Sequence, residues 1–257
     1  MLIAQITDCH IGADKFAGLA GIDAVGNLRR CVDHIVRPLQ APDAVLATGD
    51  LVNCGRDDEY QTLRACLKPL TMPLYVIPGN HDARAGLRRA FADQPYLPPG
   101  SGPIHYALAI GGLRFIFLDS VAPGEEFGCL GEAQLAWLEN CLAQAPDAPT
   151  VIVMHHPPFV IGLHRMDRIN CRDGDALADM LTHHRQVVRV LCGHTHRFAQ
   201  VDFAGSMGIA APSTAAQLEV NLTAGARAGW SAEPPAYLLH QWRPDQGMIT
   251  HLCQVLP

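Results

Sequence analysis

The sequence has no excess of basic residues and no apolar run long enough to cross a membrane. It carries 19 Lys and Arg against 25 Asp and Glu, for a formal net charge of -6. Contacts to nucleic-acid phosphates require a clustered basic face, so this balance argues against a nucleic-acid partner. Because no apolar run approaches about 18 residues and no basic leader with a cleavage site precedes the first strand-like run, we expect a soluble, cytoplasmic protein without a membrane partner.

Cysteine pairs with zinc-ribbon spacing are also absent. The nine cysteines are an odd number and none forms a CxxC pair, which disfavours a zinc ribbon or a full disulfide framework. Most of them are expected to be buried as small hydrophobic side chains. Cys9, Cys54 and Cys192 lie near the motifs described below, so a thiolate metal ligand among them stays open as a minor alternative.

The remaining composition is that of a compact α/β enzyme. Hydrophobic residues make up 49% of the 257 residues and charged residues 17%, a length that suits one large domain over 1–257. Strand-like runs of four to eight apolar residues alternate with amphipathic stretches, a pattern typical of βαβ units and a largely parallel, buried sheet. The predicted strands are 2–7, 44–48, 74–77, 150–154, 187–192, 200–203, 207–210, 236–242 and 248–255. The predicted helices are 24–39, 59–68, 83–92, 131–143 and 174–184.

Three segments are assigned by their turns or by their lack of period. A hairpin is predicted over 105–120, because Gly111 and Gly112 between two alternating runs allow the positive backbone angles of a tight turn. The aperiodic segment 157–173 is predicted to be a small cap loop beside the functional site, and 212–235 a further loop.

Five apolar runs end in residue types that bind metal ions in proteins. In "DCH", Asp8 and His10 are two positions apart and therefore point to the same side of an extended chain, while Cys9 points away. The same spacing places His194 and His196 of "GHTH" on one side of their loop. The other three runs end at Asp50 in "GD", at Asn80 in "GNHD" and at His155 in "HHPP".

These residues offer two carboxylates, one amide oxygen and four imidazoles. That set suffices for two metal ions with four protein ligands each if Asp50 bridges both ions. The mixture of nitrogen and hard oxygen donors suits Zn, Mn, Fe or Co better than Ca or Mg. Two such ions would hold a bridging hydroxide as nucleophile and neutralise phosphate oxygens during in-line displacement. Hydrolysis of a phosphate ester is therefore the expected reaction.

The residues after Asn80 are candidates for proton transfer. His81 is the nearest candidate for the general acid that gives a proton to the leaving alkoxide. Asp82, the next residue, is expected to hold the His81 ring. Both are therefore predicted to be catalytic.

Other polar residues near the motifs have less specific assignments. Asn53 could donate an amide hydrogen bond to a substrate phosphate, with a helix cap before Glu59 as the alternative. His164 in the cap segment is a candidate substrate contact. His156 is left out of the metal set because it alternates away from His155, so it is either a packed residue or one that acts beside the metals.

The motifs "DCH", "GD", "GNHD", "HHPP" and "GHTH", in this order over 8–196, resemble those of the calcineurin-like metallophosphoesterase superfamily. Within it, "TGDLVNCGRDDEYQ", "PLYVIPGNHD" and the cap sequence "MDRINC" are most similar to the class III cyclic-nucleotide and glycerophosphodiester phosphodiesterases. The resemblance implies a four-layer αββα sandwich, a small phosphodiester substrate and a homo-oligomer. It also implies two metal sites and a phosphate contact by His81. The ligands implied for the first metal are Asp8, His10, Asp50 and His196, and those for the second are Asp50, Asn80, His155 and His194.

The sequence departs from the glycerophosphodiesterase pattern at Ala216, where such members carry a histidine near the site, so substrate contacts are expected to differ. Two alternatives remain at this stage. A phosphomonoesterase or a nuclease could use the same metal ligands. A non-catalytic, metal-dependent nucleotide sensor is a further alternative, disfavoured because every expected ligand and His81 are present.

Overall fold

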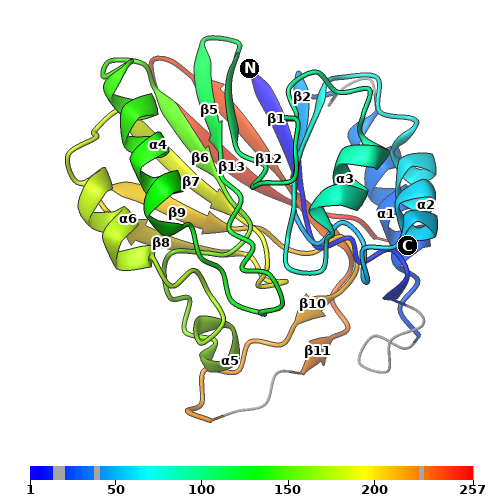
Figure 1. The fold of residues 1–257 in the computed structure, drawn as a ribbon. Coiled ribbons are helices and arrows are strands. Elements are labelled where there is room, and N and C mark those ends of the chain that lie inside the picture. The colour runs from blue at the N-terminus through cyan, green and yellow to red at the C-terminus, as the bar shows by residue number, and fades with distance from the viewer. Residues whose placement is uncertain (14–20, 38–40, 226–228, 257) are drawn as a thin grey trace.

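A computed structural model describes residues 1–13, 21–37, 41–225 and 229–256, and the chain forms two large β-sheets that lie between helices (Figure 1). The first sheet has the order β13–β12–β1–β2–β3, from β1 (Leu2–Ile6), β2 (Ala44–Thr48), β3 (Leu74–Ile77), β12 (Ala236–Arg243) and β13 (Gly247–Gln254). The second has the order β4–β5–β6–β7–β9–β8, from β4 (Tyr106–Ile110), β5 (Leu113–Phe117), β6 (Thr150–Val153), β7 (Val187–Cys192), β8 (Ala199–Phe203) and β9 (Ser206–Ala210). A small ribbon pairs β10 (Gln217–Leu218) with β11 (Trp230–Ser231).

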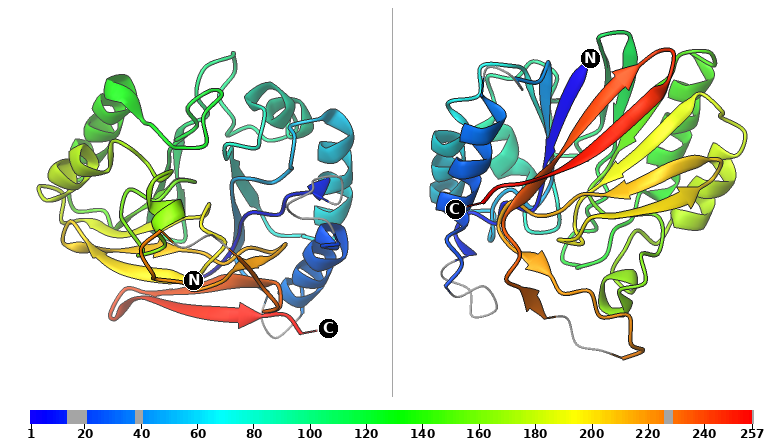
Figure 2. Two further views of the ribbon diagram at one scale, coloured as in Figure 1. Left: turned by 90° about the horizontal axis from the view of Figure 1, so that it is seen from below. Right: turned by 180° about the vertical axis from the view of Figure 1, so that it is seen from behind.

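Helices cover the outer faces of both sheets, which confirms the predicted four-layer sandwich. The first face carries α1 (Ala24–Ile35), α2 (Asp57–Leu67) and α3 (Arg84–Ala90). The second carries α4 (Gly131–Ala143) and α6 (Gly174–Leu181), and the two helical layers lie on opposite sides in the view from below (Figure 2). No helix among the described residues is both long and apolar enough to span a membrane.

Alternation along the strands explains the layers. Phe115 and Phe117 of β5 belong to the core between the two sheets, whereas Ile116 belongs to the core beneath α4 and α6. Side chains of successive strand residues point to opposite faces, so a strand buried on both faces must be apolar throughout. Each fully buried side chain of this size contributes about 2 kcal/mol relative to an exposed one.

The parallel strands determine where the loops with the metal-binding motifs meet. β1, β2 and β3 run parallel in the first sheet, and β5, β6 and β7 run parallel in the second. The C-terminal hairpin of β12 and β13 is added antiparallel to β1 and extends the first sheet (Figure 2). In each parallel set the carboxyl ends of the strands therefore lie at one edge, as expected for a ligand site in an α/β fold.

The predicted strands and helices are confirmed with shifts at their ends, and two loop predictions are corrected in part. The segment predicted as a cap loop contains a short helix, α5 (His164–Asp167), and the loop over 212–235 contains β10 and β11. The helix predicted over 24–39 ends at Ile35, and its expected last turn reaches into 38–40, outside the described residues. Four-residue helices and two-residue strands are too short to leave a hydrophobic period in the sequence.

A buried polar network connects the two sheets. Gln5 of β1 donates from Nε2 to Oγ1 of Thr48 at 3.1 Å and to the carbonyl oxygen of Cys192 in β7 at 3.0 Å. The Oε1 atom of Gln5 accepts from Nε2 of His240 at 3.0 Å, and Nδ1 of His240 lies 2.9 Å from Oγ1 of Thr250. Because the Gln5 oxygen can only accept, Nε2 of His240 carries a proton, and burial of the ring lowers its pKa and keeps it neutral at pH 7.

This network predicts a loss of stability in mild acid. Burial and the nearby charges of Arg189 and His251 lower the pKa of His240 to about 3, whereas an unfolded histidine titrates near pH 6.5. The stabilisation is therefore complete above pH ~6.5 and is lost progressively as the pH falls toward 3, by about 2 kcal/mol at pH 5. Urea unfolding at pH 7 and at pH 5 measures this loss. The His240→Gln variant should be less stable at pH 7 but should lose less on acidification, and equal losses in both proteins would contradict the assignment.

Candidate metal centre

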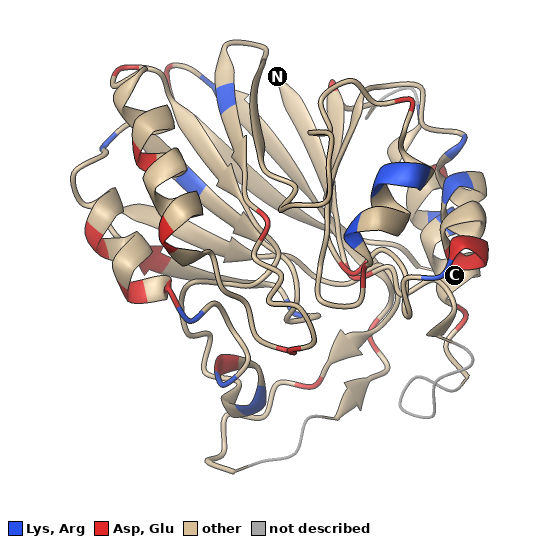
Figure 3. Cartoon of the chain, in the orientation of Figure 1, with Lys and Arg blue, Asp and Glu red and all other residues tan. Residues whose placement is uncertain are grey.

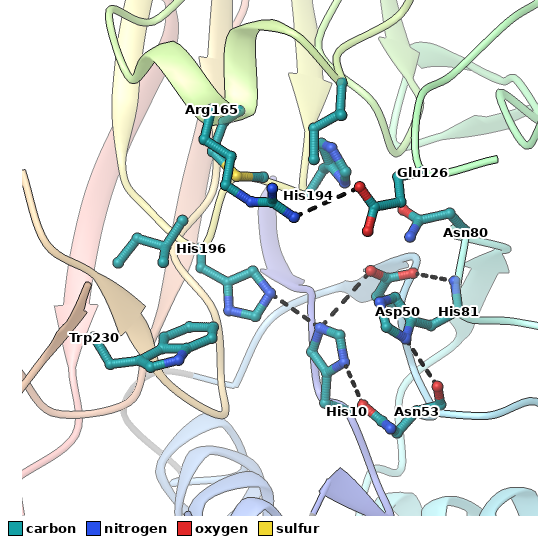
Figure 4. A pocket seen from close by; sticks show the side chains of 13 residues that line it. His10, Asp50, Asn53, Asn80, His81, Glu126, Arg165, His194, His196 and Trp230 are labelled. Carbon is teal, nitrogen blue, oxygen red and sulfur yellow. Dashed lines mark hydrogen bonds and ion pairs between the residues drawn. The ribbon is translucent and has the colours of Figure 1, made fainter. Parts of the chain in front are cut away.

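The predicted metal ligands all follow the carboxyl ends of parallel strands. Asp8 and His10 follow β1, and Asp50 follows β2. Asn80 follows β3, His155 follows β6, and His194 and His196 follow β7. The structure brings these residues together although they come from both sheets, and most of them line one pocket (Figure 4).

The backbone is strained at most of these positions. A positive φ is uncommon for residues other than glycine and costs on the order of 1–3 kcal/mol, so it persists where the surrounding structure enforces it. Six non-glycine residues of the described chain have a positive φ, and all but Ala204 are predicted ligands. These five are Asp8 (50°), His10 (44°), Asp50 (49°), His194 (70°) and His196 (48°). The chain thus turns sharply after β1, β2 and β7 and directs these five side chains toward one point.

The first group of ligands surrounds Asp8. The Nε2 atom of His196 lies 3.4 Å from Oδ1 of Asp8, and Nε2 of His10 lies 4.0 Å from the same oxygen. The two Nε2 atoms are 2.9 Å apart. Asp8, His10 and His196 therefore present three donor atoms close enough to share one cation.

Asp50 lies between this group and the second one. Its Oδ2 atom is 3.7 Å from Nε2 of His10 and 3.3 Å from Nε2 of His155. Its Oδ1 atom accepts the backbone N–H of His81 at 2.8 Å, which fixes the carboxylate. The side chain is thus in the position expected of a carboxylate shared by two ions.

Each histidine of the predicted set is oriented by a hydrogen bond from the ring nitrogen that faces away from the cluster. Nδ1 of His10 donates to Oδ1 of Asn53, Nδ1 of His155 to the carbonyl of Thr48, and Nδ1 of His196 to the carbonyl of Ala216, at 2.8–3.2 Å. The His194 ring bonds the backbone of Ile169. Such bonds fix the tautomer that leaves the Nε2 lone pair free for a metal, an arrangement common to metal-binding histidines.

Three buried polar atoms of the cluster have no hydrogen-bond partner, which indicates that these residues fit metal ions. Oδ1 of Asp8, Nε2 of His155 and Nε2 of His194 are buried and have no hydrogen-bond partner. A buried polar atom without a partner is costly, and two metal ions, one beside Asp8 and one beside His155 and His194, would satisfy these three atoms. The donor set of imidazole nitrogens and carboxylate oxygens fits two divalent ions of the first transition series.

The charges of the cluster are mutually dependent. Burial raises the pKa of Asp8, and the charge of Asp50 raises it further despite the nearby imidazoles. Burial also acts to raise the pKa of Asp50, but the contact with His155 outweighs it and holds that pKa well below the usual range. In turn Asp50 raises the pKa of His155 to about 9, against the effect of burial. Burial and the neighbouring His155 lower the pKa of His194 to about 3.

Two predicted roles, those of Asp82 and His164, are corrected by the geometry. Asp82 does not hold the His81 ring; its carboxylate accepts from the backbone N–H groups of 51, 52 and 79 and from the hydroxyl of Tyr60 at 2.9–3.4 Å. Asp82 thus ties together the loops after β2 and β3. The His81 ring is held instead by the carbonyl of Asn53, which accepts from Nδ1 at 2.8 Å.

Asn53 lines the pocket, but its side chain is engaged. Its Oδ1 accepts from His10 and its Nδ2 lies 3.4 Å from Sγ of Cys54, so Asn53 orients two histidines in addition to bordering the substrate space. His164 is exposed on α5 and does not border the pocket; the following residues, Arg165 and Met166, do. A single turn of helix sends consecutive side chains in different directions, which an assignment from composition could not resolve.

The pocket above the cluster has a cavity volume of about 350 Å³. One wall is apolar and comes from the cap and from the ribbon of β10 and β11, with the Trp230 ring centroid 5.2 Å from that of His196. At the mouth, Nη2 of Arg165 lies 3.5 Å from Oε2 of Glu126 (Figure 4), and α5 carries charges of both signs (Figure 3). Besides the predicted ligands, the residues that line the pocket are Asn53, His81, Glu126, Arg165, Met166, Ile169, Leu218 and Trp230.

Comparison with known proteins identifies the family. The model of the calcineurin-like phosphoesterase family matches residues 1–198. The chain belongs to the calcineurin-like phosphoesterase family. It is 35% identical over 254 residues to a probable glycerophosphodiester phosphodiesterase, GpdQ, of Arcobacter nitrofigilis, covering 98% of this chain and 92% of that relative. It is 33% identical over 217 residues to the 3',5'-cyclic adenosine monophosphate phosphodiesterase CpdA of Pseudomonas aeruginosa, covering 84% and 77% of the two chains.

A solved structure agrees with the fold. The dimetal phosphatase from Danio rerio superposes with a TM-score of 0.68 at 14% identity, covering 100% of this chain and 99% of that one. The family and fold expected of this calcineurin-like phosphoesterase from its motifs are therefore confirmed.

Proposed function

We propose that this protein is a dinuclear phosphodiesterase that hydrolyses small phosphodiesters, either 3',5'-cyclic nucleotides or glycerophosphodiesters. The observation that carries the proposal is the group of three buried, unpartnered donor atoms of Asp8, His155 and His194 around the shared carboxylate of Asp50. The relatives named above act on both substrate types. The proposed metals are Mn, Fe, Zn or Co. We also propose, from the sequence alone, that the protein is cytoplasmic and forms a homo-oligomer.

The ligands follow from the two groups of donor atoms. We assign Asp8, His10, Asp50 and His196 to the first ion. We assign Asp50, Asn80, His155 and His194 to the second ion. When bound, two divalent ions activate water as a nucleophile and neutralise the oxygens of the phosphate.

The other pocket residues act on the substrate and on the proton. His81 stands beside His10, with ring centroids 4.7 Å apart, and its Nδ1 is held by Asn53, which directs Nε2 toward the pocket. From there His81 gives a proton to the leaving alkoxide oxygen. The apolar wall with Trp230 accepts the esterifying group, and a cavity of about 350 Å³ suits a small ligand rather than a polymer.

A phosphomonoesterase is the second candidate, because the Danio rerio neighbour is a dimetal phosphatase with the same fold. The decisive experiment is turnover of Mn-loaded protein on bis(4-nitrophenyl) phosphate, cyclic AMP, glycerophosphocholine and 4-nitrophenyl phosphate. We expect diester kcat/KM to exceed that of the monoester at least about tenfold, a difference of 1.4 kcal/mol in transition-state stabilisation. A monoester preference would assign the chain to the phosphatases. No turnover of any of the four substrates, with Mn or after loading with Fe, Zn or Co instead, would favour a sensor.

A further inference from the structure

His156 directly follows a predicted ligand and is fully buried, but it has no role in the arrangement described above. Its Nε2 atom lies 3.1 Å from Oδ1 of Asn80, and its Nδ1 atom lies 2.8 Å from Oγ of Ser120. The backbone N–H of His156 donates to the same hydroxyl oxygen at 3.1 Å. A chain of hydrogen bonds therefore runs from the loop after β5, through the His156 ring, to the amide of Asn80.

The hydrogen-bond partners decide where the ring proton is. Oδ1 of Asn80 can only accept, so the ring nitrogen 3.1 Å from it, Nε2, carries a proton. In the neutral ring Nδ1 is then an acceptor, and the hydroxyl of Ser120, whose oxygen accepts the backbone N–H, can donate to it. A nitrogen that accepts carries no proton, so the proton of the neutral ring is on Nε2. The Nε2–H group then donates to Oδ1 of Asn80.

This bond determines which end of the amide can face a cation. Asparagine has an oxygen that binds metals and an NH₂ group that does not, and rotation by 180° about its last bond exchanges them. With Nε2–H of His156 beside it, a rotated Asn80 would place two donors against each other. The amide oxygen has two lone pairs, so one accepts from His156 while the other remains for a metal ion.

We propose that His156, itself held by Ser120, is a positioning residue that fixes the Asn80 amide with its oxygen toward the second metal ion. The inference rests on the proposed function for the presence of that ion. His156 also lies close enough to His155 and His194 to be a ligand itself. Both of its ring nitrogens are engaged, however, whereas Nε2 of His155 and Nε2 of His194 have no partner. The hydrogen bonds thus favour positioning over ligation.

Metal binding in a double-mutant cycle tests the proposal. Mn²⁺ is titrated calorimetrically into the wild type, His156→Ala, Asn80→Ala and the double variant. We expect His156→Ala to weaken one of two binding steps by about ten- to a hundredfold, the range typical of residues that orient ligands, and to leave the other step unchanged. In the Asn80→Ala background the same replacement should have no further effect, because no amide remains to be oriented. A further loss in the double variant would make His156 a ligand and overturn the proposal.

Two milder variants keep the test valid where the alanine variant is unstable. His156→Gln retains a side-chain N–H donor and should recover most of the affinity, which a loss of packing alone would not explain. Ser120→Ala should weaken the same step several-fold in the wild type and not in Asn80→Ala. Ser206→Ala on β9 is the matched control. The Ser206 hydroxyl is buried like that of Ser120 but has no hydrogen-bond partner. Unchanged Mn²⁺ affinity in both folded variants, His156→Ala and Ser120→Ala, would overturn the proposal.

The outcome for His156 is separable from that for the proposed function. A wild type that binds two Mn²⁺ ions but hydrolyses no diester would contradict the phosphodiesterase activity and leave the cycle of affinities interpretable. A wild type that binds no metal would overturn both proposals.

Discussion

Replacing Asp50 with Asn is expected to abolish the binding of the two metals as a pair and to lower kcat/KM for a diester by at least about 10³-fold. Asp50 is the carboxylate shared by both groups, since its Oδ2 atom lies 3.7 Å from Nε2 of His10 and 3.3 Å from Nε2 of His155. Each metal ion contributes several kcal/mol of charge stabilisation in the transition state, and each 1.36 kcal/mol is a factor of ten in rate. Metal content after dialysis and turnover at saturating Mn²⁺ measure the two effects.

Thermal unfolding with and without metal gives an independent measure of the same loss. A ligand at about 100 times its Kd stabilises the folded state by ~2.7 kcal/mol, so metal should raise the Tm of the wild type. Asp50→Asn keeps an oxygen that can accept the backbone N–H of His81. It removes the repulsion from Asp8 together with the attraction to His155, so the two effects oppose each other and its metal-free form should stay folded. The metal-dependent rise should disappear. Asp202→Asn, on the exposed part of β8, is the matched control and should respond to metal like the wild type. Two ions retained at wild-type affinity in Asp50→Asn would contradict the bridging role.

The seven proposed ligands could be located from the sequence because a few simple rules decide their position. Buried strands of four to six residues are recognisable by their apolar runs, and parallel strands end at the same edge of a sheet. A spacing of two residues then places Asp8 and His10 on one side. The observed geometry departs from an ideal strand, since both residues have a positive φ, but the sharp turns bring the side chains together all the same.

Residues beyond the strand ends could not be assigned in this way. The periodicity of a strand stops where the loop begins. The sequence therefore did not indicate that the Asp82 carboxylate bonds the backbone of 51, 52 and 79. Nor did it indicate that the carbonyl of Asn53 accepts from the His81 ring. The role of His156 depends on Ser120, 36 residues away and on a different strand end. Hydrogen bonds of this kind follow from the packing of the strands, which local pattern does not encode.

The residues that form the apolar wall of the pocket could not be predicted from the sequence either. Trp230 belongs to a two-residue strand, and Leu218 to its equally short partner. Neither segment has a period, and the segment 212–235 was predicted only as a loop. The pairing of the two strands places both side chains at the pocket, where the sequence contains no motif that would mark them.

Replacing His81 with Ala is expected to lower the rate of hydrolysis without loss of metal. Its ring nitrogen Nδ1 donates to the carbonyl of Asn53 at 2.8 Å. His81 lies close enough to His10 and Asp50 to share a cation with them, but the two proposed ligand sets are complete without it. A general acid typically contributes 10²–10⁴-fold, so kcat for glycerophosphocholine, whose leaving group is an alkoxide, should fall by about this factor. The metal content of the variant, measured after gel filtration, should equal that of the wild type.

The leaving group distinguishes proton donation by His81 from simple binding of the phosphate. The 4-nitrophenolate ion leaves without help from an acid, so the His81→Ala variant should lose less than about tenfold on bis(4-nitrophenyl) phosphate while it loses far more on the alkyl ester. A residue that only bound phosphate would affect both substrates alike. His183→Ala, at an exposed position near the end of α6, serves as the control for replacing a histidine. Equal losses on both substrates would restrict His81 to substrate binding, and loss of metal would instead make its place in the cluster structural.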